Sequence, residues 1–245
     1  MRQTKYIMSG GLAFSEDKDM EKLRQFSLKG WHVSGFGFMG YTLKKGESSN
    51  YIYSVDYRSL KEDEEEEYFD FFSSSGWSHI ASEGDIHLFR AQPNTKPIYS
   101  DRDTSVEKYE NSIRSMNYFA IPFVLITVLA WVVAIISSGT LQSILFTTAV
   151  IFTVIAIPTA MTVTATYNNK WKVKEKNGLV NLLKTISVLI FLIAVFILLY
   201  VDGSAINILA SMIIGAIALP TAIWAIMSLY HKMGERKLKE SNNKV

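Results

Sequence analysis

Residues 167–181, YNNKWKVKEKNGLVN, decide how the chain is threaded through a membrane, and the rest of the fold follows from that placement. This stretch is the one long polar break between apolar runs in the C-terminal half of the sequence. It holds four lysines and a single acid, which are Lys170, Lys172, Lys174, Lys176 and Glu175. Short loops that are rich in Lys and Arg stay on the cytoplasmic side of a membrane. The sequence therefore predicts that this loop is cytoplasmic.

Two apolar runs lie on each side of the loop, at residues 118–136, 143–166, 182–200 and 205–230. Their lengths match or exceed the roughly 20 residues that cross a hydrocarbon core of about 30 Å. The connections at 137–142 and 201–204 are short and carry no positive charge, which predicts tight hairpins. The C-terminal part is therefore predicted to be an all-α bundle of four transmembrane helices.

The positive charge outside this loop is expected to face the same compartment. It lies before the first run, at Arg102, Lys108 and Arg114, and after the last run, at Lys232, Arg236, Lys237 and Lys239. With four crossings, the sequence predicts a multi-pass protein of the cell (plasma) membrane with both the N- and the C-terminus cytoplasmic. Residues 1–19 lack a continuous apolar segment, so no cleavable secretory signal is expected.

The chain divides by composition into a charged part and an apolar part. It has 245 residues and a net charge of +2, but nearly every Asp and Glu lies before Asn117. The predicted domains are a cytosolic α+β domain at 1–92, a linker and stalk helix at 93–116, the four helices within 117–230, and a basic cytoplasmic tail at 231–245. A net charge this small does not indicate nucleic acid binding, which usually requires a strongly basic surface. The absence of cysteine excludes disulfides and thiolate chemistry.

The predicted α+β domain contains two similar halves, at about 5–46 and 50–91. Each half has the pattern of a strand, a helix, a Gly-Trp pair and a hairpin, with Gly30-Trp31 in the first half and Gly76-Trp77 in the second. Alternating residues at 51–57 are typical of a strand. We interpret the halves as a duplicated βαββ unit. We expect the copies to merge into one ferredoxin-like antiparallel sheet with two helices on one face.

Several aromatic segments of this domain resemble a known family. The segments are Gly30-Trp31, YIYSVDY at 51–57, YFDFFSSSGW at 68–77 and HLFRA at 87–91. Over roughly residues 5–92 the chain is similar to the domain of unknown function 2812 family of Gram-positive bacterial membrane proteins. The resemblance implies a multi-span tail and a gene often placed beside a PadR-type transcriptional regulator, hence a setting of envelope stress or drug response. The family has no established functional residues, so the resemblance assigns none.

The sequence contains no recognisable enzyme or metal motif. His32, His79 and His87 follow the two tryptophans, but zinc sites need three or four convergent ligands at recognisable spacing, so we expect no metal site. No nucleophile, P-loop or dinucleotide-binding pattern is present, so we expect no catalytic residues, no cofactor and no enzymatic activity. The acidic run at 62–67 is expected to be a solvated first helical turn, because the helix dipole favours acids there.

The sheet face without helices is the predicted partner-binding surface. Depending on strand register, it presents Phe36 and Phe38, or part of the row Tyr51, Tyr53 and Tyr57. An exposed aromatic patch usually marks a surface for a partner or a ligand. The alternative that the stalk helix or the membrane surface covers this face stays open.

These features predict a non-enzymatic integral membrane protein anchored in the lipid bilayer. Its cytosolic domain is expected to bind a protein or small-molecule partner, in envelope-stress or drug-response regulation. The alternative is a small transporter or a resistance or immunity protein that uses the bundle, with Thr153, Pro158 and Thr159 on its pathway. The bundle has no ionisable residue at mid-depth for a proton or ion relay. The oligomeric state is not defined by the sequence.

Overall fold

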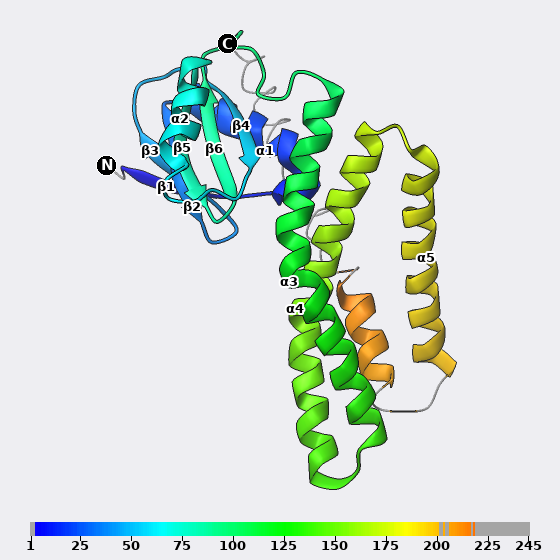
Figure 1. The fold of residues 1–245 in the computed structure, drawn as a ribbon. Coiled ribbons are helices and arrows are strands. Elements are labelled where there is room, and N and C mark those ends of the chain that lie inside the picture. Colours follow the sequence, from blue (N-terminus) through cyan, green and yellow to red (C-terminus); the bar gives the residue numbers. More distant parts are fainter. Residues whose placement is uncertain (1–2, 201–202, 204–205, 217, 219–245) are drawn as a thin grey trace, which may run out of the picture. The chain divides into compact units, whose positions relative to one another are not determined.

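The computed structural model describes residues 3–200, 203, 206–216 and 218 (Figure 1). The chain divides into two compact units. The first contains Met1–Pro122 and Ala160–Val180, and the second contains Phe123–Thr159 and Asn181–Val245. The first unit therefore includes the α+β domain together with parts of three helices, at residues 102–122, 160–173 and 177–180.

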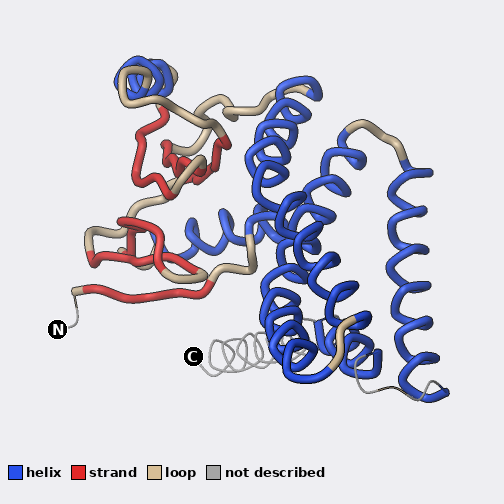
Figure 2. The backbone as a smooth tube through the Cα atoms, turned by 60° about the horizontal axis from the view of Figure 1, so that its bottom comes forward, coloured by secondary structure: helices blue, strands red, loops and turns tan. Residues whose placement is uncertain are grey.

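Six strands of the first unit form two antiparallel sheets of three strands each (Figure 2). The first sheet has the order β1-β3-β2, with β1 at Thr4–Met8, β2 at Trp31–Gly37 and β3 at Gly40–Lys45. The second has the same pattern, β4-β6-β5, with β4 at Ile52–Tyr57, β5 at Trp77–Glu83 and β6 at Ile86–Ala91. A helix follows the first strand of each half, α1 at Leu12–Ser27 and α2 at Glu65–Ser74.

The two sheets do not merge into the single sheet expected from the sequence. β2 and β5 lie beside each other, but no hydrogen-bonded ladder joins them among the described strands. Each of these strands has an irregular pairing, between Val33 and Gly35 in β2 and between His79 and Ala81 in β5. Such a bulge leaves a residue unpaired and increases the local twist, which works against pairing with a further strand. The ferredoxin-like arrangement is not confirmed.

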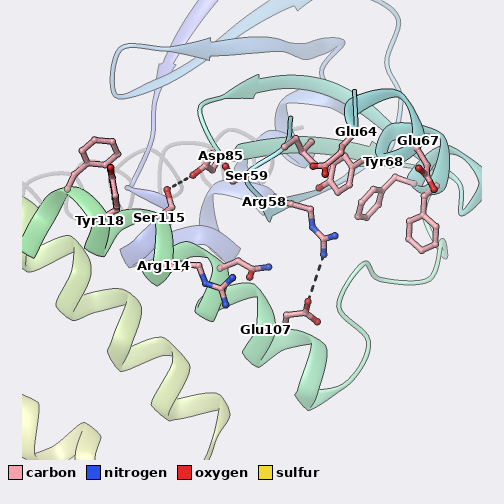
Figure 3. A pocket seen from close by; sticks show the side chains of 15 residues that line it. Arg58, Ser59, Glu64, Glu67, Tyr68, Asp85, Glu107, Arg114, Ser115 and Tyr118 are labelled. Atoms are coloured by element: carbon pink, nitrogen blue, oxygen red, sulfur yellow. Dashed lines mark hydrogen bonds and ion pairs between the residues drawn. The ribbon is translucent and has the colours of Figure 1, made fainter. Parts of the chain in front are cut away.

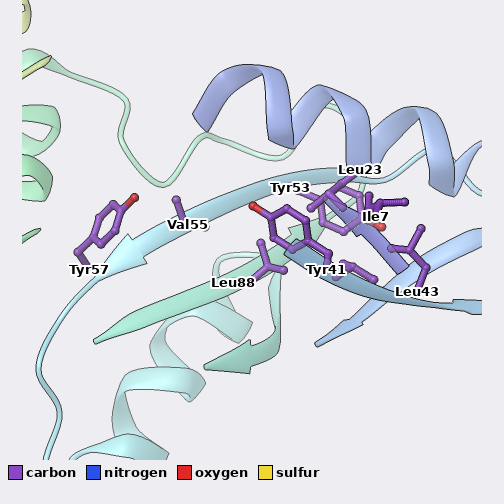
Figure 4. Packing of buried hydrophobic residues seen from close by; sticks show 9 residues of the cluster. Ile7, Leu23, Tyr41, Leu43, Tyr53, Val55, Tyr57 and Leu88 are labelled. Carbon is purple, nitrogen blue, oxygen red and sulfur yellow. The ribbon is translucent and has the colours of Figure 1, made fainter. Parts of the chain in front are cut away.

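The two helices cover opposite faces of the second sheet, so the prediction that they share one face is wrong. Successive residues of a strand point to opposite faces, and the neighbours Leu88 and Phe89 on β6 enter different core clusters. Leu88 belongs to the cluster that contains Leu23 of α1 and inward residues of both sheets (Figure 4). Phe89 packs with Tyr68 and Phe72 of α2. Because α1 and the first sheet already bury the Leu88 face, α2 packs on the other one.

Three helices of the described chain are long and apolar enough to cross a membrane. They are α3 at Arg102–Ile136, α4 at Gly139–Val173 and α5 at Asn177–Tyr200. α3 and α4 have 35 residues each. At 1.5 Å per residue each spans about 52 Å, so about 20 Å of each extends beyond a hydrocarbon core of about 30 Å. The predicted stalk is thus the first part of α3.

The fourth predicted crossing, at 205–230, is not confirmed. A shorter apolar helix at Ile206–Ala216 lies in its first half. Most of its second half and the predicted tail at 231–245 lie outside the described residues. The finding of three membrane-length helices supports a membrane protein, and the number of crossings stays a prediction.

Candidate functional site

A groove of about 1180 Å³ lies in the first unit between α2, the loop after β4, and α3 (Figure 3). Its lining combines two guanidinium groups, four carboxylates and five aromatic rings. The charged residues are Arg58, Arg114, Glu64, Glu67, Asp85 and Glu107. The rings are those of Tyr68, Phe71, Phe72, Tyr118 and Phe119. The groove therefore offers both charged and apolar surface to a bound molecule.

The charged groups of the groove are only partly paired with one another. Arg58 Nη2 lies 3.8 Å from Glu107 Oε1, and because both side chains are about half exposed this ion pair contributes little to stability. The Ser115 hydroxyl donates a hydrogen bond to Asp85. Arg114 is exposed, and no described residue forms an ion pair with it. Its guanidinium is thus available to a ligand.

The part of the groove formed by the later turns of α3 is apolar. Tyr118 and Phe119 are 77% and 71% exposed, and their ring centroids lie 5.1 Å apart. They open the apolar segment of α3, and the amphipathic ring of Tyr118 suits the membrane interface. Phe71 of α2, which also lines the groove, is 67% exposed. Exposed rings in a concave surface are typical of a ligand site.

The buried carboxylate of Asp56 on β4 holds Tyr68, one of the residues that line the groove. It accepts hydrogen bonds from the hydroxyls of Tyr68 on α2 and Tyr99 in the linker, and from the backbone N–H of Tyr57 at 2.8 Å. Burial, and then the negative charge of Asp56, raise the pKa of the Tyr68 hydroxyl, which therefore stays protonated and keeps donating. Asp56 thus connects the second sheet to α2 and to the linker before α3.

A second buried polar contact connects α1 to α3. Lys108 donates a hydrogen bond to Glu16, and their side chains are only 8% and 13% exposed. The Lys108 ammonium also lies 5.0 Å from the ring centroid of Tyr99 and 5.7 Å from that of Tyr57. Burial raises the pKa of the Glu16 carboxyl, although the Lys108 ammonium acts to lower it. These contacts attach the start of α3 to the domain.

The three histidines considered as metal ligands do not converge. His79 Nε2 and His87 Nδ1 lie 2.9 Å and 2.7 Å from the Ser82 hydroxyl, and His87 Nε2 lies 2.8 Å from the Arg58 carbonyl. Because a carbonyl only accepts, neutral His87 carries its proton on Nε2 and accepts from Ser82 at Nδ1. His32 bonds elsewhere, to a backbone carbonyl at 2.6 Å. Within the described ranges no three metal-ligating side chains gather.

The five residues predicted to form a partner surface have different surroundings. Phe38 is 89% exposed in the turn between β2 and β3. Tyr53 and Tyr57 are buried in the core cluster, and Phe36 and Tyr51 are partly buried against it. The structure therefore does not present all five on one exposed face, and partner binding through them stays a prediction.

Sequence reasoning missed the residues that build the groove and its support. Asp56 carried a detectable signal, because a charged residue interrupts the strand pattern between Val55 and Tyr57, and a buried carboxylate needs hydrogen-bond partners. Arg58 and Arg114 carried no such signal. They are far apart in the sequence and line the same groove only because α3 packs beside the domain.

The end of α4 and the lysine-rich loop belong to the same unit as the α+β domain. Lys170 and Lys174 each place their ammonium 3.0 Å from Glu110 of α3. The Asn169 side chain donates to the Ala13 carbonyl of α1 at 2.8 Å. The predicted loop at 167–181 is mostly helical, because α4 runs to Val173 and α5 begins at Asn177. Its lysines and Asn169 contact α3 and α1.

Comparison with known proteins identifies the domain but not its activity. The family model described as "Protein of unknown function (DUF2812)" matches residues 15–123. The matched segment runs from α1 into α3 and includes every residue that lines the groove, and it confirms the family resemblance. No curated protein and no solved structure matches the chain.

Proposed function

Since residues 15–123 carry the domain of the family described as "Protein of unknown function (DUF2812)", we propose that the chain is a non-enzymatic integral membrane protein whose α+β domain binds a partner in the groove. The occupant that the groove suits best is a small amphipathic molecule. A protein segment that covers the same groove is the competing occupant.

The composition of the groove lining is the observation that carries this proposal. Ligand pockets commonly enclose roughly 300–1,000 Å³ and combine apolar walls with a few polar groups. The groove has a comparable size of about 1180 Å³. Arg58 and Arg114 offer donors for the polar part of a ligand, while Tyr118 and Phe119 offer rings for its apolar part.

The two walls of the groove suggest how ligand binding affects the membrane part of the chain. One wall belongs to the domain and the other to α3, which continues into the apolar segment. A ligand that contacts both walls adds to the attachment made by Asp56 and by the Glu16–Lys108 pair. Binding thus strengthens the contact between the domain and α3. In the setting implied by the family resemblance, this change regulates an envelope-stress or drug response.

We propose the following membrane arrangement: a plasma membrane protein with four crossings, both termini cytoplasmic, and the domain facing the cytoplasm. Three membrane-length helices support the membrane location. The lysine-rich loop and the domain share one compact unit, which supports a common compartment for them. The positive charge of the loop favours the cytoplasm as that compartment.

The two halves of the domain are proposed to derive from one duplicated βαββ unit. Their elements follow in the same order, and their strands pair in the same order. Their second strands carry pairing irregularities at matching places, two residues after Trp31 and two residues after Trp77. A ferredoxin-like ancestor fits this repeated unit.

A pair of tryptophan variants tests ligand binding in the groove. Ser59→Trp fills part of the groove, whereas Ser74→Trp adds the same bulk at the exposed end of α2, outside it. The full-length proteins are purified, and mass spectrometry identifies the small molecules that copurify. We expect an amphipathic molecule to copurify with the wild type and with Ser74→Trp, and to be lost from Ser59→Trp. The same molecules in all three samples would contradict the proposal.

A further inference from the structure

We infer that an exposed apolar surface of the first unit lies on the lipid bilayer, so that the domain contacts the membrane directly as well as through α3 and α4. This apolar surface consists of Tyr6, Met8, Phe14, Phe38 and Met39. It lies outside the groove and does not depend on ligand binding there.

The side chains of the apolar surface are unusually exposed for their type. Phe38 is 89% and Met39 68% exposed, and the other three are about half exposed. Exposed apolar patches of this kind mark contacts with proteins or membranes. Met39 also has a φ of 54°, a left-handed conformation that favours glycine or asparagine. The turn thus holds an exposed methionine in a backbone conformation that L residues rarely adopt.

Hydrogen bonds attach the turn that carries Phe38 and Met39 to β1 and to Ser9, which follows it. The Tyr6 hydroxyl donates to the Phe38 carbonyl at 2.5 Å, so that the turn packs against β1. The N–H of Ser9 donates to the Met39 carbonyl at 2.9 Å. The chain then passes directly from Ser9 into the first turn of α1, where Phe14 lies.

The contact between α1 and α4 places the patch near the predicted membrane boundary. Asn169 donates to the Ala13 carbonyl at 2.8 Å, and Phe14 is the next residue. Tyr167, two residues before Asn169, ends the apolar run of α4 and is about 3 Å away along the helix axis. The Tyr167 hydroxyl accepts a hydrogen bond from Asn117 at 3.0 Å, which marks the same boundary on α3. Phe14 therefore lies about one helical turn from the boundary.

The contacts of α1 also show which part of it points away from the membrane. Glu16 meets Lys108, which precedes Asn117 on α3 by about 14 Å of helix axis. α1 has a non-helical residue, Ser15, between these two contacts, and Glu16 beyond it contacts α3 farther from the boundary than Ala13 contacts α4. Gln25 is exposed near the C-terminal end of α1, far along the helix from Phe14, and is the position expected to face water.

Lipid is the occupant that these positions favour over a protein. The patch continues the boundary defined by Tyr167, and a bilayer is already present there for α3 and α4. Lys22 donates to the Met8 carbonyl at 2.7 Å, which places a cation at the rim of the patch. Apolar side chains beside lysine suit the interface of a leaflet that contains anionic lipid.

The absence of cysteine allows a direct test with single-cysteine spin labels. Phe14→Cys, Phe38→Cys and the control Gln25→Cys are labelled in the full-length protein and placed in nanodiscs of phosphatidylethanolamine and phosphatidylglycerol. Power-saturation electron paramagnetic resonance compares collisions with oxygen, which enriches in lipid, and with a water-soluble nickel chelate. We expect oxygen to dominate at positions 14 and 38, and the chelate at position 25.

Two results would overturn the inference. Labels at 14 and 38 that resemble the label at 25 place the patch in water. Labels that are shielded from both reagents show that protein covers the apolar surface. If this shielding disappears in nanodiscs that hold a single copy of the protein, the covering protein is a second copy of the chain. Phe38 is almost fully exposed, so its substitution removes little packing, and thermal melting of the labelled variant checks that the fold is kept.

Discussion

Glu16 on α1 and Lys108 on α3 form a buried ion pair although 92 positions separate them in the chain. The pair connects the globular domain to the helix that leads into the membrane. The attraction between the two charges offsets only part of the hydration that they lose on burial, and removing one partner leaves the other charge buried and unpaired. Removing one of the two charges is thus expected to lower the stability of the protein more than removing both.

Lys108→Met is expected to lower the free energy of unfolding by about 3 kcal/mol, because it leaves the Glu16 carboxylate without its partner. Glu16→Gln combined with Lys108→Met is expected to recover most of this loss. Chemical denaturation of the full-length proteins, followed by tryptophan fluorescence, measures both effects. A double variant that is no more stable than Lys108→Met would show that the two charges are not coupled.

The pH dependence of stability is expected to contain a contribution from Glu16. Burial raises its folded-state pKa above the ordinary value of 4.5, so the folded protein binds this proton more tightly than the unfolded chain does. This proton binding stabilises the folded state fully below pH 4.5, and the stabilisation is lost as the pH rises through the folded-state pKa. Between pH 4.5 and 7 the wild type is therefore expected to lose stability relative to the Glu16→Gln/Lys108→Met double variant. Denaturation of both proteins across this range measures the difference, and the opposite slope would contradict it.

Asp56→Ala is expected to destabilise the domain by about 3 kcal/mol, because it leaves the buried hydroxyl of Tyr68 and the partly buried hydroxyl of Tyr99 without an acceptor. Tyr99→Phe removes one donor and is expected to cost about 1 kcal/mol. Tyr6→Phe, at an exposed hydroxyl, serves as the matched control and is expected to have a smaller effect. Denaturation midpoints rank the three variants. Equal effects of Asp56→Ala and Tyr6→Phe would show that Asp56 does not organise this network.

Thr153→Val is expected to lower the free energy of unfolding of the second unit by about 1 kcal/mol, because it removes a hydrogen bond between two helices. The Trp131 Nε1–H donates to the Thr153 hydroxyl at 2.7 Å, and both residues are buried. Thr147→Val is the control, because Thr147 is exposed and, among the described residues, its hydroxyl bonds to the Ser143 carbonyl of its own helix. Unfolding in mixtures of mild detergent and sodium dodecyl sulfate compares the variants. A larger effect at Thr147 would contradict the assignment.

The proposed membrane arrangement predicts which single cysteines react with a membrane-impermeant maleimide in intact cells. Ser74→Cys in the domain and Lys172→Cys at the end of α4 are expected to be protected, because both positions belong to the first unit and the loop is rich in lysine. Thr140→Cys, near the connection of α3 and α4, is expected to react. Labelling after the cells are opened confirms that the protected cysteines are present. Reaction of Ser74→Cys in intact cells would reverse the proposed orientation.

Local patterns allowed much of the domain to be predicted from the sequence. The alternating residues around Tyr53 and Tyr57 form β4, and Trp31 and Trp77 begin β2 and β5 as the Gly-Trp pairs indicated. The apolar runs correctly located three membrane-length helices. The groove was not predicted, because its charged residues come from segments that have no common local pattern.

The sequence by itself determined the six strands, the two helices of the domain and three membrane-length helices, because strand alternation, helix periodicity and the length of apolar runs depend on neighbouring residues. Only the tertiary structure decided that the six strands form two sheets, that α1 and α2 cover opposite faces, and that Glu16 meets Lys108. These features depend on contacts between residues far apart in the chain. Their free energy comes from burial and from pairing of polar groups in the assembled unit, which no single segment contains.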